Sequence, residues 1–186
     1  TLETLNIGLG SGGDSFTIQS TFTGETTLNT HNGEDTVNIQ SLDGATKVNT
    51  GNEDDVINVG SLVPVTGGNV NSINALLSIN GNEGNDTLNV DDTGDTGANT
   101  GTLTSNMITG LGITSQIIYS NLKQLNIGLG SGNDSFTLES TFEGETTLNT
   151  HNGEDTVNVI STAGTTTINT GTDSDTVNVQ SLNGET

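Results

Sequence analysis

This chain has no cysteine, no tryptophan and no arginine, and it contains a single proline. Without cysteine it can form neither a disulfide framework nor a thiolate site. Its basic side chains, apart from two histidines, are Lys47 and Lys123, which are too few to neutralise a phosphate backbone or an anionic membrane surface. No apolar run approaches the roughly 20 residues of a membrane span. We therefore expect no nucleic-acid partner and no membrane insertion.

Acidic side chains dominate the charge. The 186 residues include 23 Asp and Glu, the formal net charge is -21, and 28% of the residues are hydrophobic. Such a composition is typical of disordered chains, because little apolar surface is available to offset the entropy of ordering. A bound divalent cation would reduce the repulsion, and Ca²⁺ prefers the carboxylate, amide and carbonyl oxygens that abound here. Calcium is therefore the expected cofactor.

A long internal repeat organises the chain. Residues 5–14 read LNIGLGSGGD, and LNIGLGSGND follows 120 positions later, at 125–134. We interpret residues 5–124 as one repeat and 125–186 as part of a second, within a single domain spanning 1–186. The chain lacks the basic and apolar segments of a signal peptide. We therefore expect an internal fragment of a longer array.

A shorter period of 20 or 21 residues is marked by one aspartate in each unit. Apolar residues stand two and four positions after this marker aspartate and seven positions before it, as Phe16, Ile18 and Ile7 do around Asp14. Alternation with a period of two predicts strands, with the intervening Thr, Asn and Ser pointing outward. The marker aspartates are Asp14, Asp35, Asp55, Asp86, Asp134, Asp155 and Asp175.

The pattern predicts two strands and two turns in each unit. A single unit buries too little apolar surface to be stable alone. Stacked units predict an all-β fold, a right-handed parallel β-helix or β-roll (a solenoid) with coils of about 20 residues. Two stretches break the rhythm. Residues 62–75 hold the proline and predict a surface loop, and the more apolar residues 91–124 predict one or two wider coils. No helix is expected.

The six residues that end at each marker aspartate form what we call the marker turn. The last five residues of two of these turns, 10–14 and 130–134, read GSGGD and GSGND. Glycines allow positive φ angles and expose backbone carbonyls, and the aspartate adds a carboxylate. The pattern resembles the RTX, or haemolysin-type, calcium-binding repeat G-G-x-G-x-D-x-U-x of giant bacterial extracellular and surface proteins. Gly10 and Gly12 occupy matching positions, whereas Leu9 replaces the first glycine.

The resemblance implies a ladder of calcium ions along one edge of the solenoid. The family has calcium turns on both edges of an 18-residue coil, but the second turn of each coil here, as at 41–44 and 181–184, is poorer in acids. The acidic sequence DDTGD at 91–95 predicts a separate calcium loop. The candidate ligands are the carboxylates of the seven marker aspartates, Asp92 and Asp95, with turn carbonyls from Gly10, Gly12, Gly33, Gly51, Gly84, Gly130, Gly132, Gly153 and Gly171.

A metal-free interpretation of these aspartates stays open, because Asp favours turns by capping its own backbone. Stacked like charges are destabilising unless a cation intervenes, and Glu34, Glu53 and Asp54 crowd the same edge, which favours calcium. His31 and His151 occupy equivalent turns, where we expect exposed side chains that share no metal.

The resemblance implies a calcium-stiffened rod or fibre at the cell surface or outside the cell, such as an adhesin stalk or matrix component that folds on export into external calcium. Its expected partners are neighbouring copies of the repeat, end to end or side by side. An ice-binding or a carbohydrate- or cell-binding solenoid is the alternative. A polysaccharide lyase or epimerase needs clustered Arg, Lys, His or Tyr. We therefore expect no enzyme.

Overall fold

A computed structural model describes residues 2–180, in which every regular element is a β-strand. The all-β prediction and the expected absence of helices are confirmed for this range, and no membrane-spanning helix is found in it. The predicted turn at 181–184 lies outside the described residues. The strands are β1 (Thr4–Gly8), β2 (Ser15–Ile18), β3 (Glu25–Asn29), β4 (Thr36–Ile39), β5 (Thr46–Asn49), β6 (Val56–Val59), β7 (Leu77–Asn80), β8 (Thr87–Asp91), β9 (Thr100–Thr104), β10 (Met107–Gly110), β11 (Ile117–Ser120), β12 (Gln124–Gly128), β13 (Ser135–Leu138), β14 (Glu145–Asn149), β15 (Thr156–Val159), β16 (Thr166–Asn169) and β17 (Thr176–Val179).

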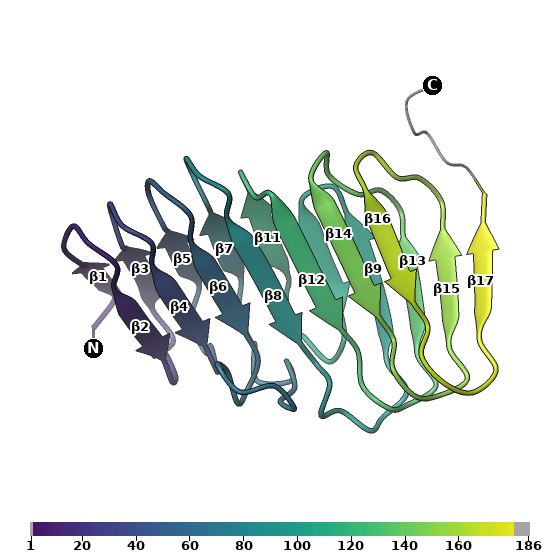
Figure 1. Ribbon diagram of the computed structural model, residues 1–186. Helices are drawn as coiled ribbons and strands as arrows, with labels where there is room; N and C mark the ends of the chain where they lie inside the picture. The colour runs from purple at the N-terminus through teal and green to yellow at the C-terminus, as the bar shows by residue number, and fades with distance from the viewer. Residues whose placement is uncertain (1, 181–186) are drawn as a thin grey trace.

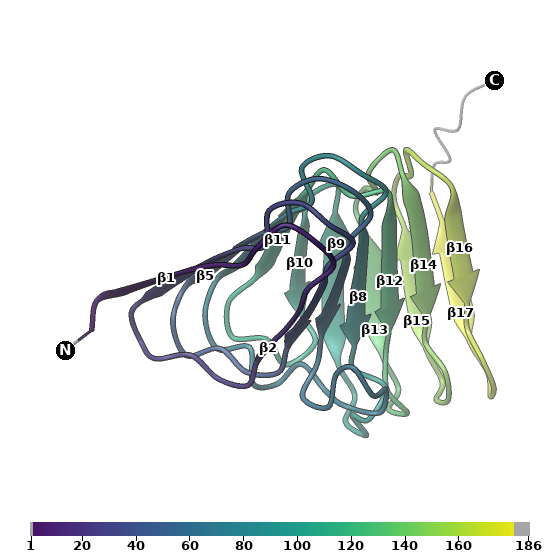
Figure 2. The same ribbon diagram turned by 60° about the vertical axis from the view of Figure 1, so that its left-hand side comes forward.

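The strands form two sheets in which parallel pairing dominates (Figure 1). One sheet has seven strands in the order β16-β14-β12-β8-β6-β4-β2, and the other has ten in the order β1-β3-β5-β7-β11-β10-β9-β13-β15-β17. Up to β8 the chain alternates between the sheets, and the paired strands up to β6 lie 20 or 21 residues apart. The stack twists, so that β1 and β17 are steeply inclined to each other in Figure 2. This arrangement is consistent with a solenoid.

The inward-facing residues form one continuous apolar column between the sheets. Leu28, Val37 and Ile39, which stand at the expected positions around Asp35, have no exposed surface. Full burial of such a side chain contributes about 1.5–3 kcal/mol, so stacking many coils stabilises a chain with a small apolar fraction. The same positions in the terminal coil are open, since Val177 and Val179 are 45% and 52% exposed.

The stretch at 62–75 is more than a surface loop. It lengthens one coil, so that the separation between stacked residues rises to 31, as between Asp55 and Asp86. Val63, Val70 and Ile73 are buried, whereas Leu62 and Val65 are exposed. The apolar residues that break the strand rhythm thus extend the core locally.

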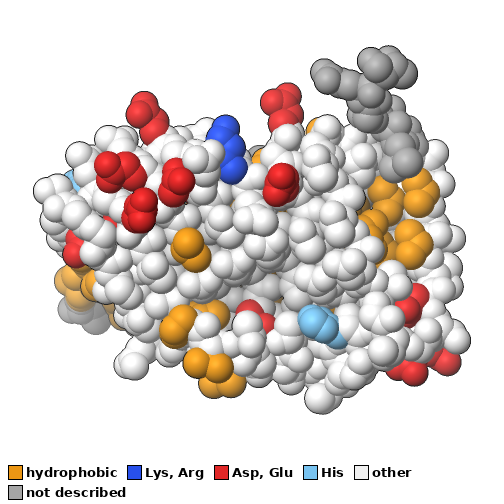
Figure 3. Space-filling view, viewed as in Figure 1, with side chains coloured by type: hydrophobic (Ala, Val, Ile, Leu, Met, Phe, Trp, Pro, Cys, Tyr) orange, Lys and Arg blue, Asp and Glu red, His pale blue; other side chains and the backbone are white. Residues whose placement is uncertain are grey.

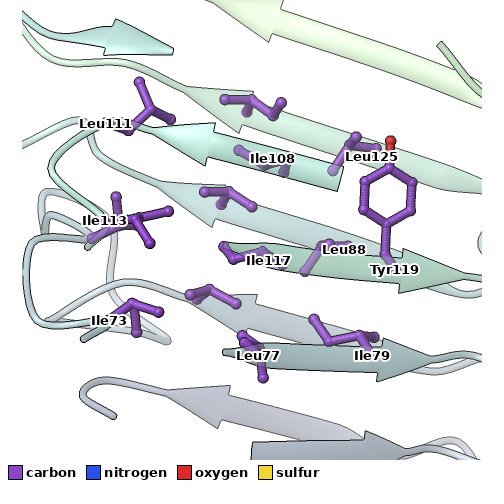
Figure 4. Close-up of a cluster of buried hydrophobic side chains, with 14 of the residues drawn as sticks. Ile73, Leu77, Ile79, Leu88, Ile108, Leu111, Ile113, Ile117, Tyr119 and Leu125 are labelled. Carbon is purple, nitrogen blue, oxygen red and sulfur yellow. The ribbon is translucent and has the colours of Figure 1, made fainter. Parts of the chain in front are cut away.

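The prediction of wider coils at 91–124 is wrong. Here the chain leaves β8 and enters β9, which pairs with β13 much further along the stack. It then turns back through β10, which pairs antiparallel with β9 and β11, and β11 pairs parallel with β7. Apolar side chains of these strands and of their neighbours fill the space between the sheets (Figure 4), including Ile108, Leu111, Ile117 and Tyr119. The ten-stranded sheet gains its three additional strands at this point.

This hairpin moves the marker turns from one edge of the stack to the other. The chain has eleven strands, β1 to β11, before β12, which is the repeat equivalent of β1. β9, β10 and β11 all lie in the ten-stranded sheet, so the chain returns to the seven-stranded sheet at β12, whereas β1 lies in the ten-stranded sheet. The marker turns before β2, β4, β6 and β8 therefore lie at a first edge, and those before β13, β15 and β17 lie at the opposite, second edge. The expectation of a single edge is wrong, and Figure 3 shows acidic side chains gathered at the upper left and again at the lower right.

Candidate calcium-binding turns

Each marker aspartate is joined to its neighbour in the stack through the backbone. One carboxylate oxygen, Oδ1, accepts a hydrogen bond from the backbone N–H of the residue that occupies the marker position in the coil before it. Asn99 takes that position in the coil before Asp134, because the chain enters β9 there. The bonded pairs, each with the N–H donor first, the Oδ1 acceptor second and the N–O distance in brackets, are Asp14 and Asp35 (2.7 Å), Asp35 and Asp55 (2.8 Å), Asp55 and Asp86 (3.0 Å), Asn99 and Asp134 (2.8 Å), Asp134 and Asp155 (2.8 Å), and Asp155 and Asp175 (3.0 Å).

The second carboxylate oxygen, Oδ2, is buried without a hydrogen-bond partner in five of these residues, and each of the five is at most 3% exposed. An ionised oxygen in that position has lost its water and gained no donor, which is costly unless a proton or a cation replaces the water. Asp14 and Asp175, in the terminal coils, are only half-buried. The five orphaned oxygens belong to Asp35, Asp55, Asp86, Asp134 and Asp155.

Burial raises the pKa of several marker carboxyls. The pKa of Asp86 rises to about 6, chiefly through desolvation and further through the carboxylates of Asp55 and Asp54, although the N–H of Asp55 opposes the shift. Desolvation also raises the pKa values of Asp55 and Asp134. The stacked carboxylates are therefore hard to ionise together without a counter-ion.

Gly81 marks a place where two oxygens face a common space. A Cβ built on Gly81 would lie 2.4 Å from Oδ2 of Asp86 and 2.4 Å from the carbonyl oxygen of Asn121. A carboxylate oxygen and a backbone carbonyl oxygen are both ligands that Ca²⁺ prefers. The residues present thus fit a hard cation, although the described residues contain no cluster of three or more Asp, Glu, His or Cys side chains. A calcium site here would need backbone carbonyls and water to complete its ligands.

Most glycines of the marker turns are required, but for different reasons, and Gly10 is an exception. Gly12 has a positive φ of 134°, as expected. Gly130 and Gly132 lack a positive φ but approach other backbone closely, because a Cβ on them would lie 1.9 Å and 2.1 Å from the carbonyl oxygens of Asp95 and Gly97. Gly10, the repeat equivalent of Gly130, meets nothing within 4 Å. Five further candidates have positive φ, namely Gly33, Gly51, Gly84, Gly153 and Gly171.

The candidate loop at 91–95 already has protein partners for its carboxylates. Asp92 is fully buried, its Oδ1 accepts from the N–H of Val70 at 3.0 Å, and its Oδ2 accepts from Nδ2 of Asn99 at 3.3 Å. Asp95 accepts from Nδ2 of Asn71 at 2.8 Å and from the N–H of Gly97 at 2.7 Å. These bonds hold the long loops at 60–76 and 92–99 together at the second edge.

The pKa values of the Asp92 and Asp95 carboxyls in this loop are shifted in opposite directions. Desolvation raises the pKa of Asp92 to about 7, and the carboxylates of Asp95 and Asp134 add to the rise. The backbone N–H of Gly97 is the main cause that lowers the pKa of Asp95. The calcium assignment of Asp92 and Asp95 stays a prediction.

Buried threonines complete the marker turns, and the sequence reasoning missed them. Thr30, Thr50 and Thr150 stand five positions before their marker aspartates and have no exposed surface. The hydroxyl of Thr150 donates to the carbonyl oxygen of Thr170 at 3.0 Å, and that of Thr50 donates to the carbonyl oxygen of Gly81 at 3.1 Å. The recurrence of Thr five positions before the marker aspartate is the sequence pattern from which these residues could have been predicted.

Comparison of the chain with protein-family models, with curated proteins and with solved structures finds no match. What the marker turns do is therefore inferred from their own geometry.

Proposed function

We propose that this chain is a calcium-binding structural repeat of a large extracellular protein, folded as a right-handed β-solenoid with coils of about 20 residues. The observation that carries the proposal is the row of buried Oδ2 atoms without donors at successive marker turns. In a chain of net charge -21, a divalent cation supplies the missing positive charge at neutral pH without requiring protonation. Asp35, Asp55, Asp86, Asp134 and Asp155 would provide the carboxylate ligands.

The proposed role is mechanical. Calcium between stacked turns would hold coils together at both edges of the rod, because the marker turns change edge at the hairpin of β9 and β10. Low calcium inside the cell would leave the chain unfolded, and external calcium would then fold it after export. Neighbouring copies of the repeat are the proposed partners. No enzymatic activity is proposed, since two lysines, no arginine and one tyrosine offer little for acid–base chemistry.

The test is a titration of EDTA-treated protein with CaCl₂, followed by far-ultraviolet circular dichroism and size-exclusion chromatography, with MgCl₂ in parallel. We expect an expanded, weakly structured apo chain that becomes compact and β-rich with calcium and much less so with magnesium. If the apo chain is already a compact β-rod and calcium changes neither signal, the marker aspartates only accept backbone hydrogen bonds and the calcium proposal fails.

A matched pair of variants separates site loss from a general change of charge. Asp155→Asn keeps an oxygen that can accept the N–H of Asp134 but removes the ionised Oδ2. Asp43→Asn removes one charge from an exposed turn that is not a marker turn. We expect the calcium midpoint to rise for Asp155→Asn and to stay near that of the unmodified chain for Asp43→Asn. Equal shifts in both variants would point to charge screening alone.

A further inference from the structure

An open hollow of about 590 Å³ lies over three stacked marker turns at the first edge, within the range of size of small-molecule sites. Six asparagines, one histidine, one glutamate and one glycine line it. The hollow is separate from the buried Oδ2 atoms, since its side chains at Asn32, Asn52 and Glu83 are exposed. No charged ligand of the proposed calcium sites lies in its wall.

Gly51 forms the floor of the hollow, where the neighbouring backbone leaves no room for a side chain. Gly51 stands four positions before its marker, where the preceding coil has His31 and the following coil has Asn82. A Cβ on Gly51 would lie 1.6 Å from the carbonyl oxygen of His31, so this position stays empty between two side chains. His31 and Asn82 both adopt positive φ angles, 75° and 64°, which is unusual for residues other than glycine.

Two rows of amides flank this floor, and each keeps unused hydrogen-bonding capacity. Nδ2 of Asn49 donates to Oδ1 of Asn29 at 2.8 Å, and Nδ2 of Asn52 donates to Oδ1 of Asn32 at 3.1 Å. A side-chain amide has two N–H donors and two acceptor lone pairs, so each of these residues retains donors or acceptors for a ligand. Neighbouring coils repeat the pattern at about 4.8 Å, the spacing of strands in a sheet.

The composition of the hollow limits the class of ligand. Glu83 and the net charge of -21 disfavour anions such as acidic sugars or phosphates. Apart from the imidazole of His31, the lining contains no aromatic ring, and it contains no aliphatic side chain, which disfavours apolar ligands. We propose that this hollow binds a neutral saccharide, whose hydroxyls bridge the two amide rows above Gly51. Gly51 and Asn121 line this hollow and also carry backbone carbonyls that are candidate calcium ligands, so the test holds the calcium concentration fixed.

The second repeat contains a natural control. Asn149, His151, Asn152 and Asn169 are the equivalents of the first-repeat residues at the start of the hollow. Thr172 replaces Asn52. His151 instead lines a different hollow, of about 580 Å³, whose wall includes the apolar side chains of Val63, Pro64 and Val65.

The test uses the two histidines of the chain as reporters. The imidazole proton resonances of His31 and His151 are followed by nuclear magnetic resonance in calcium-containing buffer, with stepwise addition of maltohexaose, cellohexaose, laminarihexaose, mannohexaose and chitohexaose. We expect at least one oligosaccharide to shift the His31 signal in a saturable manner and to leave His151 unchanged. No saturable shift with any of the five, or equal shifts at both histidines, would overturn the proposal.

Substitutions then locate the bound sugar. Asn52→Ala should weaken binding by about tenfold, the effect expected from losing hydrogen bonds of about 1.4 kcal/mol in total. Thr172→Ala, at the equivalent position of the second repeat, should leave the affinity unchanged and serves as the matched control. If the His31 signal responds to added CaCl₂ in calcium-free buffer and to none of the sugars, the hollow is a cation site and the saccharide assignment is wrong.

Discussion

The backbone N–H of Asp134 donates to Oδ1 of Asp155 at 2.8 Å, while Oδ2 of the same carboxylate is buried without a donor. One side chain therefore has two separable roles. Oδ1 joins adjacent coils whether or not a cation is present, and Oδ2 needs a proton or a cation. The metal-free and calcium-bound interpretations of the marker aspartates thus concern different atoms of the same residue.

Gly10→Ala and Gly130→Ala should differ strongly although both lie in the same LGSG sequence. A Cβ on Gly130 would lie 1.9 Å from the carbonyl oxygen of Asp95, and forcing that backbone apart should lower the free energy of unfolding by about 1–3 kcal/mol. Gly10 faces open space, so Gly10→Ala should change it by less than about 0.5 kcal/mol. Urea unfolding at fixed calcium concentration measures both, and equal losses would contradict the packing shown at Gly130.

Without calcium, stability should fall as the pH rises from about 4 to about 7. The pKa values of Asp86 and Asp92 are raised to about 6 and about 7 in the folded state, above the ordinary value of 3.8. Groups with raised folded pKa values contribute their full stability below the unfolded pKa and lose it as the pH passes the folded pKa. Asp95, whose pKa is lowered, acts in the opposite sense, but only in more acidic solution.

The folded fraction in EDTA, followed by far-ultraviolet circular dichroism across this pH range, measures the effect. Asp86→Asn should flatten the dependence, because one of the groups that bind a proton on folding is removed. Saturating calcium should also flatten it if the ion binds the ionised carboxylates. A stability that rises toward pH 7 in EDTA would show that the buried carboxyls are not protonated in the folded state.

Asn89→Ala should destabilise the protein by about 1–2 kcal/mol. Nδ2 of Asn89 donates to Oδ1 of Asn58 at 2.8 Å, and its Oδ1 accepts from Nδ2 of Asn126 at 2.8 Å, so two amide bonds are lost. Thr147 aligns with Asn126 in the next strand, and its hydroxyl bonds to no described residue. Thr147→Ala is therefore the control, and thermal unfolding of the two variants should separate them. Indistinguishable melting temperatures would mean that the asparagine row does not stabilise the sheet.

Tyr119→Phe tests the packing of the antiparallel hairpin. The buried hydroxyl of Tyr119 donates to the carbonyl oxygen of Thr104 at 2.7 Å, and burial raises its pKa well above the ordinary value of 10.0. Removing the hydroxyl leaves that carbonyl without its donor, at a cost of about 1–2 kcal/mol in the free energy of unfolding. The ring packs edge-on against Phe142 at 5.9 Å and should stay in place. A variant as stable as the parent would show that the hydroxyl is not held by the hairpin.

The regular coils could be derived from the sequence because their signal is local and repeated. The alternation around Asp35 predicts which side chains are buried, and Leu28, Val37 and Ile39 are buried as expected. The stretch at 91–124 could not be derived in the same way. Its apolar residues have no period that distinguishes a parallel coil from an antiparallel hairpin, because Ile108 pairs with Leu103 and Ile117 only through the turn of the chain.

The sequence by itself determined that this protein is built from short strands, which side chains face its core, and where its aspartate-rich turns fall, because all three follow from spacing along the chain. Only the tertiary structure decided on which edge each turn lies. β9, β10 and β11 share the ten-stranded sheet, so β12 lies in the seven-stranded sheet although its repeat equivalent β1 lies in the other. Asp86 and Asp134 therefore belong to opposite edges although their sequences are alike. It also decided that Oδ1 of each buried marker has a donor and Oδ2 has none, because that difference depends on the neighbouring coil and not on the residue itself.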